Sequence, residues 1–288
     1  MSDVNSIQWF PGHMARTRRR ITEDLKLVDV VAELLDARIP ASSRNPVLGD
    51  IIKRKPRVVL LNKSDLADPE VTARWVRAFR EQGVNAIPLD CKSGKGVASL
   101  EPGLRETLKD QIAGWEAKGM VGRPIRMMVV GIPNVGKSSL INRLVKKAGK
   151  AQVQDRPGVT RQNNWFTVSK GLELLDTPGV LWPKFEDPLV GERLAFTGAV
   201  KDEILDVEGL AARLLEELMR LYPQAVNTRY KTAFDPAESL PGWQLLEGVG
   251  RKRGMLISGG EIDTERAANA VLDEFRGGQL GRITLERP

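Results

Sequence analysis

The sequence is poor in cysteine, histidine and aromatic residues. One cysteine, Cys91, and one histidine, His13, occur in 288 residues, and aromatic residues make up 5%. A single thiol excludes an internal disulfide framework and suits a reducing compartment. The low aromatic content argues against a platform that stacks single-stranded bases. No apolar run approaches the ~20 residues that cross a bilayer, so we expect no membrane insertion.

Charge and the first residues narrow the class further. The start, MSDVNSIQWF, resembles neither a secretory signal nor an Arg-rich transit peptide, so we expect a cytoplasmic protein. The formal net charge is +7 and the pI is about 9.6. A basic excess of this kind favours an anionic partner, most commonly nucleic acid.

Apolar runs of strand length alternate with helical stretches in the first part of the chain. This alternation predicts an α/β fold with a doubly wound, mostly parallel sheet. A Gly-rich stretch at 114–124 is expected to be a connector within it. The predicted strands are 30–37, 57–62, 84–90, 125–131, 164–169 and 172–177, and one predicted helix starts near Pro69.

After about residue 185 the pattern becomes helical. We therefore expect two domains, 1–185 and an all-helical 186–288. Thr264 is the expected N-cap of a helix in the second domain. An apolar stripe marks an earlier helix and is most simply the core of a helix bundle; it contains Val207, Leu210, Leu214, Leu218 and Leu221.

The segment GIPNVGKSS contains a phosphate-binding loop. Residues 131–138 fit G-x-x-x-x-G-K-[ST] between a predicted strand and a predicted helix, which is the context that the motif requires. Backbone N–H groups would surround phosphate oxygens, and the helix N-terminus adds partial positive charge. Lys137 would reach the β- and γ-phosphates, and the Ser138 hydroxyl would ligate Mg²⁺. The predicted nucleotide contacts here are Asn134, Val135, Gly136, Lys137, Ser138 and Ser139.

Two downstream elements complete a switchable phosphate site. Asp176 and Gly179 form a D-x-x-G motif in which the carboxylate holds Mg²⁺ through water and the glycine N–H contacts the γ-phosphate. Thr160 lies between this motif and the phosphate loop. It is either an ordinary loop threonine or a Mg²⁺ ligand that is ordered only while a γ-phosphate is present.

The segment NKSD at 62–65 predicts guanine specificity. Asp65 can accept from guanine N1–H and N2–H₂, a donor pair that adenine lacks. Asn62 can bond the other base edge or brace the loop, and the Lys63 stem can lie along the ring. A second loop follows the next strand, and its backbone at Cys91 and Lys92 could meet guanine O6. The predicted ligands are therefore GTP and GDP.

The order of these motifs is unusual. Ordinary Ras-like GTPases have the phosphate loop first and the base reader last. Cutting such a domain between its third and fourth strands and joining its old ends gives the order found here. The motifs NKSD, GIPNVGKSS, PGVT and DTPG resemble those of circularly permuted GTPases. WFPGHMARTRR and DARIP resemble the ribosome biogenesis GTPase A (RbgA/YlqF) family over nearly the whole chain.

This resemblance implies GTP hydrolysis coupled to a late step of large-subunit assembly in bacteria or organelles. We expect the protein to be a monomer. Val180 occupies the position at which Ras-like proteins use a glutamine to orient water. The family is thought to use the histidine of its FPGHMA motif instead, which is His13 here; otherwise His13 would only cap a basic helix. Asn134 corresponds to an asparagine that holds K⁺ in similar GTPases, or it makes a local hydrogen bond.

Two basic clusters point to structured RNA. ARTRRR at 15–20 and GRKRG at 250–254 would be attracted to phosphates, although exposed charged helix faces are common. With the resemblance, the large ribosomal subunit and its rRNA become the expected partners. The alternatives are another structured RNA or the small subunit. A metabolic P-loop kinase, or an RNA-binding protein with a vestigial nucleotide site, is disfavoured by the intact motifs.

Overall fold

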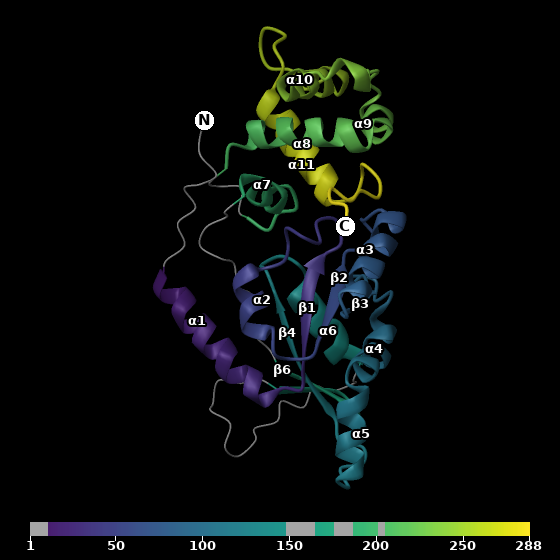
Figure 1. Ribbon diagram of the computed structural model, residues 1–288. Coiled ribbons are helices and arrows are strands. Elements are labelled where there is room, and N and C mark those ends of the chain that lie inside the picture. The colour runs from purple at the N-terminus through teal and green to yellow at the C-terminus, as the bar shows by residue number, and fades with distance from the viewer. Residues whose placement is uncertain (1–10, 148–164, 176–186, 201–204) are drawn as a thin grey trace.

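The computed structural model describes residues 11–147, 165–175, 187–200 and 205–288 (Figure 1). These residues contain one six-stranded sheet in the order β3-β2-β1-β4-β6-β5. Every neighbouring pair is parallel except β5 and β6. The strands are β1 Val30–Asp36, β2 Arg57–Asn62, β3 Asn85–Pro88, β4 Ile125–Gly131, β5 Trp165–Ser169 and β6 Leu172–Leu175.

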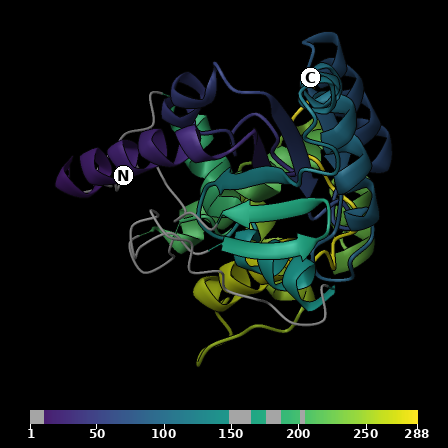
Figure 2. The same cartoon turned by 90° about the horizontal axis from the view of Figure 1, so that it is seen from below.

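Helices cover both faces of this sheet. In the N-terminal part of the chain these helices are α1 Pro11–Asp24, α2 Pro46–Ile52, α3 Pro69–Glu81, α4 Leu100–Thr107, α5 Lys109–Ala117 and α6 Lys137–Lys147. Helices α1, α2 and α3 pack on one face, and α4 and α6 pack on the other. Seen from below, the strands lie in the middle of the helices, with α1 (purple) at the left (Figure 2). This arrangement confirms the predicted doubly wound fold.

The sequence of β1 explains why helices cover both faces of the sheet. All seven residues of VVAELLD are buried, as expected for a parallel strand with both faces covered. Even-numbered residues such as Val30 and Leu34 share a core with the apolar faces of α4 and α6. Val31 packs instead with α1 and α2, and Leu35 packs with α3. The alternation of side chains along the strand therefore gives each face its own helix layer.

Helices also make up the C-terminal part, as predicted, apart from an isolated β-bridge between Leu256 and Ile262 in the described residues. They form a layer over the edge of the sheet at which β1 ends (Figure 1). The predicted stripe on α8 is confirmed, since Leu210, Leu214 and Leu218 are buried. The helices are α7 Pro188–Phe196, α8 Val207–Leu221, α9 Pro223–Tyr230, α10 Gly242–Lys252 and α11 Thr264–Arg276.

One local prediction was wrong, and another was right only in part. Thr264 is not the N-cap of α11: the Asp263 carboxylate accepts from the Arg266 N–H at 3.0 Å, and the Thr264 hydroxyl donates to Glu208 instead. The expected connector 114–124 begins inside α5, which continues to Ala117. Trp115 packs partly against the core, and this contact favours the helix over the cost of Gly114, roughly 1 kcal/mol.

No helix within the described part of the chain is both long enough and apolar enough to cross a membrane.

Candidate functional site

Two of the predicted motifs, the phosphate loop and the base reader, meet at the carboxyl edge of the sheet. The phosphate loop follows β4, the base reader follows β2, and β1 pairs with both of these strands. From β1 the strand order proceeds one way to β2 and β3, and from β4 the other way to β6 and β5. Ligands of doubly wound sheets bind outside the carboxyl ends of strands at such a switch point. The topology therefore places one crevice between Asp36 and Gly131.

The phosphate loop has the backbone that its role requires. Asn134 and Gly136 have positive φ angles of 58° and 101°, and α6 begins at Lys137. A Cβ added at Gly136 would lie 2.2 Å from the Asn62 side-chain nitrogen, so only glycine fits. A cavity of about 520 Å³ borders the loop, with Lys137 and Ser138 in its lining. The loop and its cavity fit a phosphate chain held by backbone N–H groups.

Asn62 joins three loops. Its buried side-chain amide donates to the Val135 carbonyl at 2.7 Å and accepts from the Cys91 N–H at 3.0 Å. The phosphate loop, the base reader and the second base loop are thereby fixed to one side chain. Of the two roles predicted for Asn62, the structure shows the brace.

Lys63 belongs to a charge cluster that the motif alone did not predict. Its ammonium lies 2.9 Å from the Asp36 carboxylate, and the buried Arg38 guanidinium donates to both oxygens of the same carboxylate, at 2.9 and 2.8 Å. Burial alone would raise the pKa of Asp36, but Arg38 and Lys63 outweigh it and hold that pKa well below its usual range. The DARIP segment thus orients the lysine of the base reader. The available sequence signal for this cluster was a pair of opposite charges, Asp36 and Arg38, at the end of the buried strand β1.

Asp65 lines a second cavity. This cavity, of about 430 Å³, is lined by Asn62, Lys63 and Asp65 from the base reader and by Cys91 and Lys92 from the second base loop. Asp65 is exposed, so its carboxylate can meet a base. Asn134, Gly136 and Ser139 line this cavity and the phosphate cavity alike. A base and its phosphates can therefore lie in one continuous site.

The second base loop is held by its own hydrogen bonds. The Lys92 N–H donates to the Asp90 carboxylate at 2.7 Å, and the Cys91 N–H is used by Asn62. Contact of either N–H with guanine O6 would have to share or replace these bonds. Burial, with the nearby Asp90 carboxylate, raises the pKa of the Cys91 thiol to about 12, so the thiol is neutral near pH 7.

The helical layer also reaches the site, which the sequence did not predict. The Asn134 side-chain amide donates to the Gly198 carbonyl, just beyond α7, at 2.8 Å. Thr197 and Arg276 line the base cavity, and Arg276 donates to the Ala195 carbonyl at 2.9 Å. These residues lie far from the motifs in sequence and match no pattern of their own.

Comparison with known proteins decides the family. A family model described as 50S ribosome-binding GTPase matches residues 126–220. Ribosome biogenesis GTPase A of Bacillus cereus is 49% identical over 98% of this chain and 94% of its own length. The Thermotoga maritima protein of the same name is 32% identical over 98% and 95%. The chain belongs to the ribosome biogenesis GTPase A family.

Solved structures of the family agree. A GDP-bound YlqF structure covers 94% of this chain and 99% of its own, at 30% identity and a TM-score of 0.66. A GNP-bound YlqF from T. maritima covers 95% and 98%, at 28% identity and a TM-score of 0.64. The suspected membership and the GTPase fold are thus confirmed, and this family member is a GTPase that binds guanine nucleotides.

Several predicted residues of this GTPase are not placed. Thr160, Asp176, Gly179 and Val180 lie outside the described residues. His13 lies within α1, but its side chain is outside the described ones. In the described part of the chain, no group of three or more His, Cys, Asp or Glu side chains could hold a metal ion.

The two basic clusters are partly neutralised. In the first, Arg18 and Arg19 are exposed, and Arg19 lies 3.1 Å from Glu23. In the second, Arg251 and Lys252 are exposed in the last turn of α10. Arg253 pairs with Glu274 at 2.6 Å. That arginine serves the packing of α11, so the second cluster offers fewer cations than its sequence indicates.

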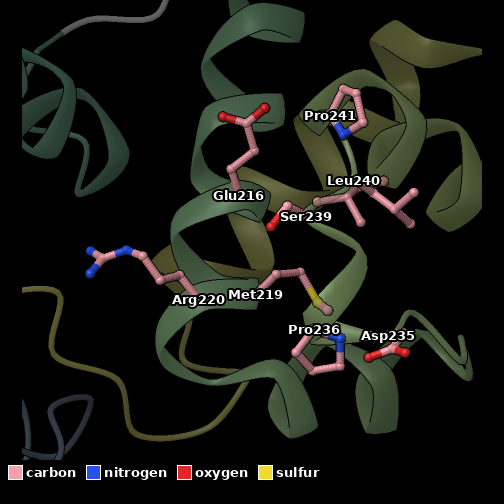
Figure 3. Close-up of a pocket in the computed structure, with 9 residues that line it drawn as sticks. Glu216, Met219, Arg220, Asp235, Pro236, Ser239, Leu240 and Pro241 are labelled. Carbon is pink, nitrogen blue, oxygen red and sulfur yellow. The ribbon is translucent and has the colours of Figure 1, made fainter.

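A separate hollow of about 320 Å³ lies in the helical layer (Figure 3). It is bordered by α8, through Glu216 and Met219, and by the turn before α10. The Glu216 carboxylate accepts from the Gly242 N–H at 2.6 Å. A Cβ at Gly242 would lie 2.3 Å from the Ala212 carbonyl oxygen. The hollow lies beside the close crossing of α8 and α10, and its lining shares no residue with the two cavities of the nucleotide site.

Proposed function

We propose that this GTPase binds GTP and GDP across the two adjoining cavities. The observation that carries the proposal is their shared lining, since Asn134, Gly136 and Ser139 border both. Asp65 accepts from the two guanine donors, and the Lys63 stem lies along the ring while Asp36 holds its ammonium. Backbone N–H groups from Val135 onward and the Lys137 ammonium hold the phosphates.

The residues also fit a Mg²⁺ ion beside the phosphates. Ser138 borders the phosphate cavity and would supply a hydroxyl ligand. Thr160 and Asp176 would complete the set, the first only in the GTP state, and Gly179 would contact the γ-phosphate. When bound, Mg²⁺ supplies positive charge to the phosphate oxygens.

His13 is the proposed residue that orients the attacking water, since Val180 has no hydrogen-bonding side chain. A neutral imidazole accepts a proton from water near pH 7. Asn134 is the proposed K⁺ ligand. A cation needs the amide oxygen, whereas the bond to Gly198 uses the amide nitrogen, so the two roles are compatible.

The proposed partner is the large ribosomal subunit with its rRNA. The family model describes 50S binding, and Arg18, Arg19, Arg251 and Lys252 are exposed cations that suit RNA phosphates. The protein would act as a cytoplasmic monomer. Residues 1–185 would form the GTPase domain, and 186–288 would form a ribosome-binding domain that responds to nucleotide through the segment after Gly179. Another structured RNA or the small subunit remains the alternative partner.

GTP turnover with and without ribosomal subunits tests the partner. We expect large subunits to raise turnover by at least ~10-fold, equivalent to about 1.4 kcal/mol of barrier, and small subunits, as the matched control, to raise it little. No rise with either subunit would remove the ribosome from activation. Equal ribosome affinity with GDP and with a non-hydrolysable GTP analogue would contradict nucleotide control of binding.

Two substitutions test the proposed roles within the site. Asp65→Asn replaces an acceptor with a donor, so preference should shift from guanine to xanthine nucleotides, whose 2-oxo group accepts; unchanged preference would remove Asp65 from base recognition. His13→Ala should lower turnover strongly while GTP affinity stays nearly the same. Unchanged turnover would exclude His13 as the water-orienting residue.

A further inference from the structure

The segment from Gly281 to Arg287, which we call the C-terminal strap, lies against the loop that carries Asp65. In Figure 1 the C-terminus lies between the helical layer and α3, beside the carboxyl end of β1. The strap is well packed although it contains no helix or strand: Ile283 and Leu285 are each 2% exposed, and Thr284 is completely buried. It is therefore a fixed part of the fold.

The strap bonds the backbone of the base-reading loop at four positions, residues 64, 66, 67 and 68. The Arg282 guanidinium donates to the Ser64 and Ala67 carbonyls, each at 3.0 Å. The Ile283 N–H donates to the Leu66 carbonyl at 2.9 Å. The Thr284 hydroxyl accepts from the Asp68 N–H at 3.0 Å. Both backbone neighbours of Asp65 are thus bonded to the strap.

The other end of the strap is anchored to both layers of the molecule. The Leu285 N–H donates to the Arg38 carbonyl at 2.8 Å. The buried Glu286 carboxylate accepts from the Ala41 N–H at 2.6 Å and from the Arg193 guanidinium of α7 at 3.2 Å. The Glu286 backbone carbonyl accepts from the Trp75 indole N–H of α3 at 3.2 Å. The strap therefore links the position of α7 to that of the base-reading loop.

An exposed loop gains affinity for its ligand when it is held in the binding conformation beforehand. Asp65 is exposed and needs its carboxylate aligned with two guanine donors. The motif supplies the residue type, whereas the bonds of Ser64, Leu66 and Ala67 to the strap fix where that residue lies. Loosening these bonds should weaken guanine recognition more than phosphate binding.

We propose that Arg282 and Thr284 are positioning residues for guanine recognition, acting through the backbone on either side of Asp65. The inference rests on the proposed function, since it assumes that Asp65 meets the base. It also gives the helical layer a second route to the nucleotide: movement of α7 away from Glu286 would pull on the loop that selects guanine.

The test uses the full chain and fluorescent GDP and IDP. Hypoxanthine lacks the N2 amino group, so the ratio of GDP to IDP affinity reports how well the Asp65 carboxylate meets that group. The variants are Arg282→Ala, Thr284→Val and their combination. Thr284→Ser keeps the hydroxyl and should rescue binding. Arg266→Ala, an exposed arginine of α11, is the matched control.

We expect the double variant to release GDP at least ~10-fold faster, equivalent to about 1.4 kcal/mol. The GDP-to-IDP preference should fall by roughly threefold or more. Arg266→Ala and Thr284→Ser should behave like the unsubstituted protein. A folded double variant with unchanged GDP release and unchanged preference would overturn the proposal.

Arg282 is exposed, so Arg282→Ala should fold even if the double variant does not. Faster amide hydrogen exchange at residues 64–68 in this variant would support the proposal that the strap positions the base-reading loop, and unchanged exchange there would overturn that proposal. Failure of the unsubstituted protein to bind GDP would overturn the nucleotide site itself and the strap's role with it. Normal GDP binding with insensitive variants would overturn the strap alone.

Discussion

Asn62→Asp is the sharpest test of how the three loops are joined. The substituted side chain has nearly the same shape. It keeps the oxygen that accepts from the Cys91 N–H, but it places a second oxygen where the amide nitrogen now lies, 2.7 Å from the Val135 carbonyl oxygen. One favourable bond becomes a repulsive contact at a position that is 3% exposed.

The size of the effect follows from these contacts. A lost hydrogen bond costs ~0.5–1.5 kcal/mol, and a buried carbonyl left without a donor costs a further ~1–3 kcal/mol. We therefore expect the free energy of unfolding to fall by ~2–4 kcal/mol near pH 7. Because the phosphate loop shifts with Val135, GDP affinity should fall by ~10-fold or more.

The dependence on pH makes the test specific. Burial and the facing carbonyl raise the pKa of the introduced carboxyl above its unfolded value of roughly 3.9. The protonated form can donate to Val135 as the amide did. The loss in the free energy of unfolding should therefore shrink as pH falls through the raised pKa, and grow as pH rises through that pKa.

Urea unfolding at several pH values, with GDP titrations, measures both effects. Asn269→Asp is the control, because Asn269 is exposed and its amide donates to the Glu265 carbonyl one turn before it, at 3.0 Å. It should change stability by no more than ~0.5 kcal/mol. If Asn62→Asp were equally harmless, Asn62 would not join the loops.

Two further predictions concern neighbouring residues. Gly136→Ala should lower both GDP affinity and stability, because a positive φ costs ~1–2 kcal/mol for alanine and because the added Cβ meets the Asn62 side chain. Adding Asn62→Ala should relieve the contact with Asn62 but not the cost of the positive φ. Wild-type GDP affinity in Gly136→Ala would contradict this geometry. Asp36→Asn leaves Arg38 buried without its countercharge and should cost ~3–5 kcal/mol. Arg38 and Lys63 hold the pKa of Asp36 below the usual 3.8, so the stabilisation by its carboxylate is present above that pH and is lost as pH falls through the lower folded pKa. Thermal unfolding from neutral to acid pH should therefore show the stabilities of the two proteins converging. A constant difference in stability would refute this role of Asp36.

The sequence predicted the elements whose signals are local. The strand β1 was visible as a buried apolar run, and α8 as a helical stripe. The phosphate loop was visible because its glycines and lysine have fixed spacing, and this spacing follows from contact with phosphates. Guanine binding was indicated for a similar reason, since the spacing of NKSD suits a base reader in which we propose that Asp65 meets the guanine.

Contacts between distant segments could not be predicted in this way. Gly198 bonds Asn134 through a backbone carbonyl, and any residue carries such a group. Arg282 resembles any other exposed arginine in a basic protein. Asn62 showed two possible roles in the sequence, and only the folded chain shows that Val135 and Cys91 are its partners.

The strand order has a consequence for synthesis of the chain. Strands β1, β2 and β3 are neighbours in sequence and in the sheet, so they can pair as soon as residue 88 has left the ribosome. The strand that carries the phosphate loop, β4, is made later and closes the free edge of β1. Until then the nascent chain presents an open apolar strand edge, which is prone to wrong pairing. This GTPase thus emerges with the strand that precedes NKSD first, and the phosphate loop joins it only after the middle of the sheet has been filled.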